Sequence, residues 1–407
     1  MAEPLPILGA ASTGAMRADA ALRGTAARFE GLYVHVPFCL HKCHYCDFYS
    51  FVDAEGRQPA YASRLESELD FLGGFAVAPL QAVFFGGGTP TLLDPPLLRR
   101  ALGAVARRMP LAVGAEWTVE ANPETVDAEV AGVLASAGVN RVSLGAQSFD
   151  ARHLKVLERS HDPARVGRAV RILREAGIGR ISLDLIFGIP GQSPADWAAD
   201  LDAALALGPD HLSCYALTYE PNTAMTARLR RGEFEPCDES AEADMLELAA
   251  RRLADSGFAR YEVSNWARIR DGDSRAEECR HNLLYWRNRD WLAAGPSASG
   301  HARGTRWKNV PRLGDWLATE GPSPVVDVER GGPDQVAGER LMMGLRLVRG
   351  IPDPELEEIL ALGSRGPARA AVIEREVRAG RMARAEGSLR FTGHGMMTAN
   401  ETLAALV

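Results

Sequence analysis

The sequence predicts an α/β protein in which a partial, open (β/α)6 barrel precedes a small, mostly helical domain. Two observations indicate this fold class. Between residues 31 and 265, short β-prone runs alternate with amphipathic helical stretches, which is typical of a parallel sheet with crossover helices. Six such units suit a partial barrel better than a closed eightfold one. From residue 266 onward the alternation stops, so a different organisation is expected there.

The segment before the first expected strand, residues 1–30, is rich in alanine and glycine and has no compact apolar core. It contains Glu3, Asp19 and Glu30, and these acidic residues argue against a secretory signal and against a transit peptide. We therefore expect residues 1–30 to be a disordered or mis-annotated N-terminal extension.

Each unit of the barrel, residues 31–265, joins an apolar run to a helical stretch. The expected strands are 32–37, 82–88, 116–123, 140–148, 180–191 and 211–221. The expected helices lie near 57–72, 95–108, 127–137, 163–176, 194–206 and 240–256. The run YEVSNWA, residues 261–267, is a candidate for a last strand.

Polar residues and glycines gather where these strands end. They are Gly86 to Thr89, Glu120, Asn122, Gln147, Asp184 and Tyr215. The carboxyl ends of parallel strands build the ligand site in folds of this kind, so five consecutive units direct side chains toward one mouth. The sequence therefore predicts a single ligand site at this end of the barrel.

The chain beyond the barrel divides into a connecting region, residues 266–332, and a C-terminal domain, residues 333–407. The connecting region holds a charged loop and the aromatic stretch HNLLYW, His281 to Trp286. The C-terminal domain is mostly helical and ends with a short strand, a turn and a helix, which predicts a winged-helix-like module. It lacks a basic face, and this argues against binding to nucleic acid.

Composition predicts a soluble, cytoplasmic protein. The hydrophobic content of 46% and charged content of 24% are ordinary, and the net charge of −7 does not attract nucleic acid or an anionic membrane. No apolar run approaches the roughly 20 residues that span a bilayer. Cys214, Cys237 and Cys279 are scattered, unlike a secreted disulfide framework, and we interpret them as core or loop residues in a reduced protein.

Three further cysteines stand close together in PFCLHKCHYCDF, residues 37–48, with the spacing C-x3-C-x2-C. Cys39, Cys43 and Cys46 would share one face of a helix, so one interpretation is a set of small buried side chains. The polar residues between them favour ligation instead. A zinc site completed by a nearby histidine (His35, His41 or His44) and a [4Fe–4S] cluster with one open iron are the two alternatives.

The spacing, with Tyr45 directly before the last cysteine, resembles the signature of the radical S-adenosylmethionine (radical SAM) superfamily. In that superfamily the amine and carboxylate of S-adenosylmethionine chelate the open iron. The resemblance therefore implies a [4Fe–4S] cluster on three cysteines, because the cosubstrate supplies the fourth ligand. It also implies a radical SAM barrel, and FFGGGTP, Phe84 to Pro90, resembles the loop that receives the amino group of the methionine moiety.

Within the superfamily, residues 31–400 resemble the branch that contains oxygen-independent coproporphyrinogen III oxidase and the heme chaperone HemW. The resemblance implies a series of contacts to S-adenosylmethionine, in chain order. They are Tyr33, Gly87, Gly88, Thr89, Glu120, Gln147, Arg159, Asp184 and the backbone near Ala216. The carboxylates and the amide suit ribose hydroxyls and the amine, and the arginine suits a carboxylate. Any one of these residues, taken alone, could instead be a polar strand end bonded to its own loop, but the whole series in family order argues against that alternative.

Two functions are consistent with this branch. One is an oxidase that removes carboxylates from the propionates of coproporphyrinogen III by hydrogen abstraction. It is expected to carry a cysteine two residues after the third cluster ligand, where this chain has Phe48, and an N-terminal arm that nothing before residue 31 resembles. The other is a heme chaperone, and Phe48 has the form of the motif that the chaperones carry. The sequence therefore favours the chaperone.

HNLLYW also matches the HNxxYW motif of the heme chaperones. His281 is the expected ligand of heme iron, and Tyr285 and Trp286 offer rings that can lie against the macrocycle. A structural His–Asn pair beside an aromatic cluster is the alternative for this motif. The resemblance further implies heme acceptors among respiratory hemoproteins, reached by transient membrane contact without a membrane span. Weaker candidate ligands are His301, His394, Met396 and Met397.

Overall fold

The protein is built on a curved thirteen-stranded sheet, and the computed structural model describes residues 16–17, 22, 27–159 and 161–407. Six of its strands lie side by side in chain order and run parallel. They are β2 (Gly31–Val36), β3 (Leu80–Gly87), β4 (Leu111–Ala121), β5 (Arg141–Gln147), β6 (Arg180–Phe187) and β7 (His211–Ala216). The predicted partial barrel of six units is confirmed.

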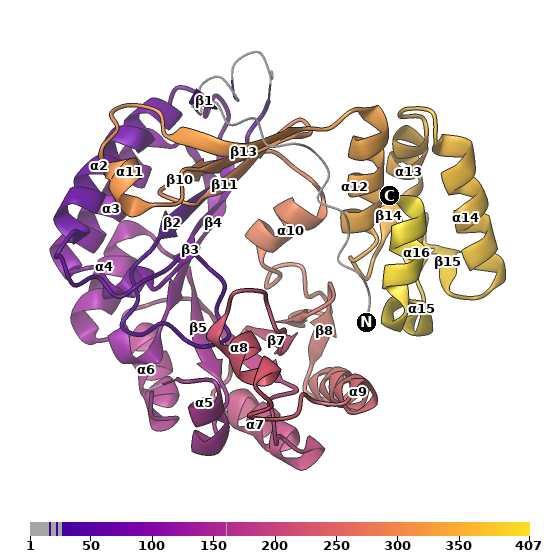
Figure 1. Cartoon of the computed structure of the whole chain (residues 1–407), viewed down its shortest axis with the longest axis horizontal. Coiled ribbons are helices and arrows are strands. Elements are labelled where there is room, and N and C mark those ends of the chain that lie inside the picture. The colour runs from indigo at the N-terminus through magenta and orange to yellow at the C-terminus, as the bar shows by residue number, and fades with distance from the viewer. Residues whose placement is uncertain (1–15, 18–21, 23–26, 160) are drawn as a thin grey trace.

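Helices cover the outer face of this sheet (Figure 1). They are α2 (Gln58–Leu72), α3 (Pro95–Arg108), α4 (Ala128–Ala137), α6 (Ala164–Glu175), α7 (Pro194–Ala206) and α9 (Glu239–Asp255). Helix α3 shows why they pack there, since Leu98, Leu102 and Val105 share one buried face and the basic residues of the last turn remain outside. The short helices α5 (Ala151–Val156) and α8 (Ala224–Arg230) were not predicted, because neither is long enough to show a clear period.

Further strands, antiparallel to their neighbours except at one pair, extend both edges of this sheet. On the β7 edge lie β9 (Asn265–Arg268) and β8 (Phe258–Arg260). On the β2 edge, β10 (Trp291–Ala294) pairs parallel with β2, and β11 (Ser299–Ala302), β12 (Thr305–Asn309) and β13 (Pro324–Arg330) follow. Much of region 266–332, expected only as a connection, is therefore part of the barrel sheet. Between β12 and β13 lies α11 (Leu313–Leu317).

The expectation of disorder for residues 1–30 falls largely outside the described residues. Of this segment, β1 (Met16–Arg17) pairs antiparallel with β13, and Leu22 and Phe29 are buried against the main core. The described parts of the segment therefore contact the sheet.

The C-terminal domain has its own small sheet and its own core. Its elements are α12 (Pro333–Gly344), β14 (Ile351–Pro352), α13 (Asp353–Leu360), α14 (Gly366–Arg378), β15 (Met382–Ala385), β16 (Ser388–Phe391), α15 (Gly393–Met397) and α16 (Ala399–Leu406). Leu341, Ile373 and Leu389 are fully buried in a cluster separate from the barrel core. From α12 to β16 the order is helix, strand, two helices and two strands, as expected for a winged-helix-like module. Within the described residues, no helix has the length and hydropathy to cross a membrane.

Candidate functional site

A cavity of about 570 Å³ lies at the carboxyl ends of the parallel strands. It is lined by the cysteine loop after β2 and by the ends of β3 to β7. The residues predicted from the sequence that line it are Cys39, Cys43, Cys46, Phe48, Gly87, Gly88, Thr89, Glu120, Gln147, Arg159, Asp184 and Ala216. The structure therefore brings twelve residues from seven parts of the chain to one mouth, as the positions of the strand ends led us to expect.

The three cysteines lie on a loop that is closed at its base. Phe51 N donates to Pro37 O at 3.0 Å and Cys39 N donates to Phe51 O at 3.0 Å. Inside the loop, Lys42 Nζ donates to Phe48 O at 2.7 Å. The cysteines therefore do not lie on a helix, and the interpretation as one buried helical face is wrong.

The spacing of the thiols also separates the two metal alternatives. Thiolates that share one zinc ion lie about 3.8 Å apart, since each Zn–S bond is about 2.3 Å and the geometry is tetrahedral. Over the described part of the chain, Cys39, Cys43 and Cys46 belong to no group of potential ligand atoms within 4.8 Å of one another. At least one pair of these sulfurs therefore lies farther apart than one zinc ion would hold them, which favours a cluster, because a cluster binds each thiolate at a different iron.

Polar groups approach the cysteine sulfurs from two other parts of the chain, the turn after β3 and the segment after α5. Thr89 Oγ1 lies 3.8 Å from Cys39 Sγ, and Arg159 Nη1 lies 3.5 Å from Cys43 Sγ. Burial raises the pKa of the Cys39 and Cys46 thiols, so a bound cation is needed to hold them as thiolates near neutral pH.

The glycine-rich turn after β3 needs glycine for steric reasons. Gly87 has a φ of +105°, and a Cβ there would collide with the imidazole of His35. A Cβ on Gly88 would lie 2.6 Å from Phe38 O. The backbone thus passes close to the cysteine loop and exposes its polar groups to the cavity.

Two half-buried carboxylates face the cavity without an ion-pair partner among the described residues. Glu120 Oε2 accepts a hydrogen bond from Gly87 N at 3.0 Å, and both oxygens of Asp184 accept from Ser143 Oγ at 3.0 Å. Burial, together with the charge of Asp184, raises the pKa of Glu120 to about 8. This pair suits a ligand that carries a positive group and hydroxyls.

Gln147 and Arg159 stand at the two ends of the segment that follows β5. Gln147 has a φ of 63°, which is a strained conformation for a residue other than glycine and is common at functional sites. Arg159 Nη2 donates to Gly145 O at 2.7 Å, whereas its Nε, also buried, has no partner. A buried, unpaired N–H of this kind fits the carboxylate of a ligand.

Comparison with known proteins agrees with this geometry. A family model described as Radical SAM superfamily matches residues 33–204. Heme chaperone HemW of Mycobacterium tuberculosis (strain ATCC 25618 / H37Rv) is 40% identical over 328 residues, which cover 79% of this chain and 83% of the relative. Heme chaperone HemW of Bacillus subtilis (strain 168) is 31% identical over 384 residues, which cover 93% and 99%. The chain belongs to the heme chaperone HemW family of the radical SAM superfamily.

One solved structure shows the same fold over nearly the whole chain. Coproporphyrinogen III oxidase (HemN) from Escherichia coli superposes with a TM-score of 0.79, covering 95% of this chain and 92% of its own. The two sequences are 22% identical, so this likeness concerns the fold alone.

The HNLLYW stretch of this HemW-family chain forms α10 (Arg280–Trp286), which Figure 1 shows between the barrel and the C-terminal domain. His281 is only 2% exposed. Its ring stacks on Phe84 with centroids 4.7 Å apart, and its Nε2 lies 2.7 Å from Tyr285 Oη. The imidazole is therefore covered on several sides and does not line the cavity.

Tyr33, the other predicted residue that does not line the cavity, belongs to the same aromatic group. Its ring stacks on Phe84 and on His281, at centroid distances of 6.2 and 5.9 Å. Its hydroxyl lies 3.0 Å from His35 Nδ1. Phe84 does line the cavity, so in this structure Tyr33 and His281 support its wall from behind.

Sequence reasoning missed several polar residues of the cavity. Thr118, Ser143, Ser182, Ser213 and Asn282 all line it. The first four each lie two residues before another residue of the same strand that lines the cavity, and alternate residues of a strand face the same side. That period of two was the available signal.

The remaining candidates lie elsewhere in the structure. His301 is buried, with Nδ1 2.8 Å from Arg289 O, whereas His394, Met396 and Met397 belong to α15 of the C-terminal domain. Cys214 is buried in β7 and Cys237 is half-buried. Cys279 is buried at the cavity wall and its Sγ lies 3.4 Å from Glu116 Oε1.

Proposed function

We propose that this protein is a heme chaperone that holds a [4Fe–4S] cluster and S-adenosylmethionine and delivers heme to acceptor hemoproteins. The observation that carries the proposal is Phe48, an aromatic side chain 61% exposed at the cavity mouth in a chain of the HemW family. The oxidase of the same branch is expected to have a cysteine at this position. A phenyl ring suits contact with an apolar macrocycle and cannot do the chemistry of a thiol.

Cys39, Cys43 and Cys46 would hold the cluster. When both are bound to the protein, the cluster and S-adenosylmethionine would supply one-electron chemistry. The free Nε of Arg159 would bind the methionine carboxylate, and Glu120, beside the turn of Gly87, would accept a hydrogen bond from the amine. Tyr33 is proposed to act indirectly, by supporting the ring of Phe84 on which it stacks. The other residues proposed to contact this ligand are Gly88, Thr89, Gln147, Asp184 and Ala216.

The heme is proposed to rest on the rim of the same cavity. Leu40, Phe48 and Tyr215 line the cavity and are 47%, 61% and 43% exposed. Large apolar side chains gathered on an open rim mark a place where a flat apolar ligand covers them. His41 also lines the cavity and is exposed, so it places an imidazole at the rim.

His281 remains the ligand that the family motif implies. In the structure its ring is covered by Phe84, Tyr33 and Tyr285, so iron reaches it only if α10 moves. Burial lowers the pKa of His281 to about 3, and the neutral imidazole that results is the form that ligates iron. His41 requires no such movement.

The test is to add heme and coproporphyrinogen III separately to anaerobically reconstituted protein. We expect heme to bind and to give a Soret band, and we expect no conversion of coproporphyrinogen III with S-adenosylmethionine and a reductant. Turnover to protoporphyrinogen IX at enzymic rates would contradict the proposal and favour the oxidase.

Acceptors are proposed among respiratory hemoproteins, with the protein in the cytoplasm and in brief contact with the membrane. Heme-loaded protein, mixed with an apo-hemoprotein, should lose its Soret band as the acceptor gains one. Separation of the two proteins after mixing measures the transfer directly. If the heme stays with this protein in the presence of every acceptor tried, delivery as a function is contradicted.

A further inference from the structure

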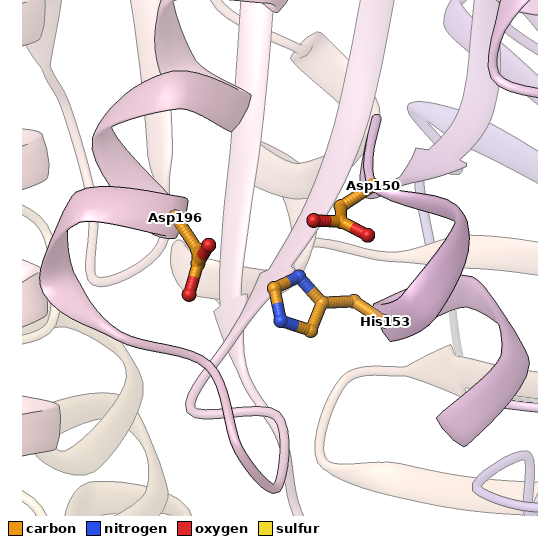
Figure 2. Close-up of side chains that lie close together, drawn as sticks. All are labelled: Asp150, His153 and Asp196. Carbon is orange, nitrogen blue, oxygen red and sulfur yellow. The ribbon is translucent and has the colours of Figure 1, made fainter.

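Three potential metal ligands lie together outside the cavity, in the first turn of α5 and its N-cap and in the first turn of α7. They are Asp150, His153 and Asp196, and one ligand atom of each lies within 4.8 Å of the others. Figure 2 shows the ring of His153 between the two carboxylates. Two elements that are distant in sequence thus present one nitrogen and two oxygen ligands to a shared space.

The histidine is the observation that points to a ligand. His153 is 3% exposed, and its Nδ1 has no hydrogen-bond partner. Burying a ring nitrogen without a partner costs free energy, so such atoms normally indicate a missing ion or water. In Figure 2, Nδ1 lies on the side of the ring that faces Asp150.

In each carboxylate one oxygen caps a helix, and the other contacts a cation, which in this structure is the guanidinium of Arg152. Asp150 Oδ1 accepts from Arg152 N at 2.7 Å and Asp196 Oδ2 accepts from Ser193 N at 2.9 Å, so these oxygens cap the two helices. The other oxygens, Asp150 Oδ2 and Asp196 Oδ1, both accept from Arg152 Nη2, at 2.6 and 3.0 Å. The Arg152 side chain is 71% exposed, so its guanidinium can leave the site for solvent.

We propose that Asp150, His153 and Asp196 bind a divalent first-row transition metal ion such as Mn²⁺ or Zn²⁺. One imidazole and two carboxylates suit these ions, and three protein ligands leave positions for water. Ligands about 2.1 Å from one ion lie within about 4.2 Å of each other. The site therefore needs only a small closure of the side chains, with Arg152 displaced outward.

A metal ion at this position would join α5 to α7. The segment that it holds begins after Gln147 and ends before Arg159, and both of these residues line the cavity. Metal binding would therefore restrict the motion of Gln147 and Arg159, two residues of the proposed S-adenosylmethionine site. This consequence rests on the proposed function, whereas the metal site itself does not.

The experiment is a Mn²⁺ titration of the cluster-loaded protein, followed by the EPR signal of free Mn²⁺. The oxidised cluster is diamagnetic and does not interfere, and Mn²⁺ has little affinity for thiolates, so the cluster cysteines do not compete. We expect one saturable site per chain, from which Zn²⁺ displaces Mn²⁺. Asp196→Asn and His153→Gln should weaken Mn²⁺ binding about tenfold or more.

Two further variants sharpen the result. Asp202→Asn removes a carboxylate that is 51% exposed on the same helix as Asp196, and it should leave Mn²⁺ binding unchanged. Arg152→Ala should tighten Mn²⁺ binding, because it removes the competing cation. Thermal unfolding of each variant shows whether a ligand change has simply unfolded the protein, and Asp150→Asn provides a third ligand variant.

The proposal is overturned if Mn²⁺ has no saturable site, or if the folded ligand variants bind Mn²⁺ as the unmodified protein does. Loss of Mn²⁺ binding in Asp202→Asn would also overturn it, because the binding would then be a general effect of surface charge. If Mn²⁺ binds as expected but leaves the affinity for S-adenosylmethionine unchanged, the metal site stands and its link to the cavity is wrong.

Discussion

Arg159 Nη1 lies 3.5 Å from Cys43 Sγ, so a guanidinium from the segment after β5 contacts a cysteine of the loop after β2. The same side chain donates through Nη2 to Gly145 O at 2.7 Å. One half-buried positive charge therefore touches the proposed cluster ligand and the wall of the proposed cosubstrate site. This contact links the two sites electrostatically.

Arg159→Gln should lower the reduction potential of the reconstituted cluster, because a positive charge beside a thiolate stabilises the more reduced, more negative cluster. It should also weaken binding of S-adenosylmethionine about 10- to 100-fold, since a hydrogen bond to a charged group contributes about 1.5–3 kcal/mol. A redox titration followed by EPR and equilibrium dialysis measure the two effects. Arg165→Gln, an exposed change on α6, is the control. An unchanged potential would contradict the electrostatic link.

Alanine at Cys39, Cys43 or Cys46 should abolish the cluster, and alanine at Cys214, Cys237 or Cys279 should not. The first three lie on one closed loop, whereas the others are distributed over β7, a loop and the start of α10. Iron analysis after anaerobic reconstitution should give about four irons per chain. Stoichiometric zinc in iron-replete protein would count against the cluster.

Affinity for S-adenosylmethionine should rise with pH up to about 8, the pKa to which burial and Asp184 raise Glu120. A positively charged ligand binds the ionised carboxylate, so the affinity should increase about tenfold per pH unit below that pKa and then level off. Dialysis between pH 6 and 9 measures the slope. The Glu120→Gln variant should bind S-adenosylmethionine weakly at every pH. An affinity of the unmodified protein that does not change with pH would contradict the role proposed for Glu120.

The same carboxyl group should affect stability in the ligand-free protein. The pKa of Glu120 is raised above its ordinary value of 4.5, so the folded state holds a proton that the unfolded state releases. This contribution to the free energy of unfolding is complete below pH 4.5 and is lost as the pH rises through about 8. Denaturant unfolding at several pH values should show this decline in the free energy of unfolding, and the decline should be smaller in the Glu120→Gln variant.

His281→Ala should lower the free energy of unfolding by about 2–4 kcal/mol, because it removes a buried ring that stacks on both Tyr33 and Phe84. Exposed His394 provides the control, and His394→Ala should have no such effect. If His281 also ligates heme, the Soret band of the folded variant should change. If the band changes in His41→Ala instead, the iron ligand lies on the cavity rim.

Phe48→Ser should weaken heme binding without changing the free energy of unfolding, because the ring is 61% exposed and contributes little to the core. Val77→Ser, at an apolar position that is 80% exposed outside the cavity, is the matched control and should leave heme binding unchanged. Heme titration followed at the Soret band measures both variants. Equal affinity in Phe48→Ser would contradict a heme position on the rim.

The sequence by itself predicted the six units, the cysteine loop and most of the cavity, because these features depend on local patterns. Apolar periods of two and 3.6 mark strands and helices, and parallel strands that are adjacent in the chain bring their carboxyl ends together without further information. Glu120, Gln147 and Asp184 are therefore predicted to lie at one mouth from the sequence alone. The C-x3-C-x2-C spacing is local in the same sense.

Only the tertiary structure decided how distant segments meet. The pairing of β10 with β2 brings Trp291 beside Gly31, and nothing local in either strand specifies that partner. The same is true of α10, whose His281 has the residue type of a heme ligand but stacks on Phe84, almost two hundred positions away in the chain. Residue type and spacing show what a side chain can bind. Its burial and its neighbours depend on long-range packing, which a single sequence does not display.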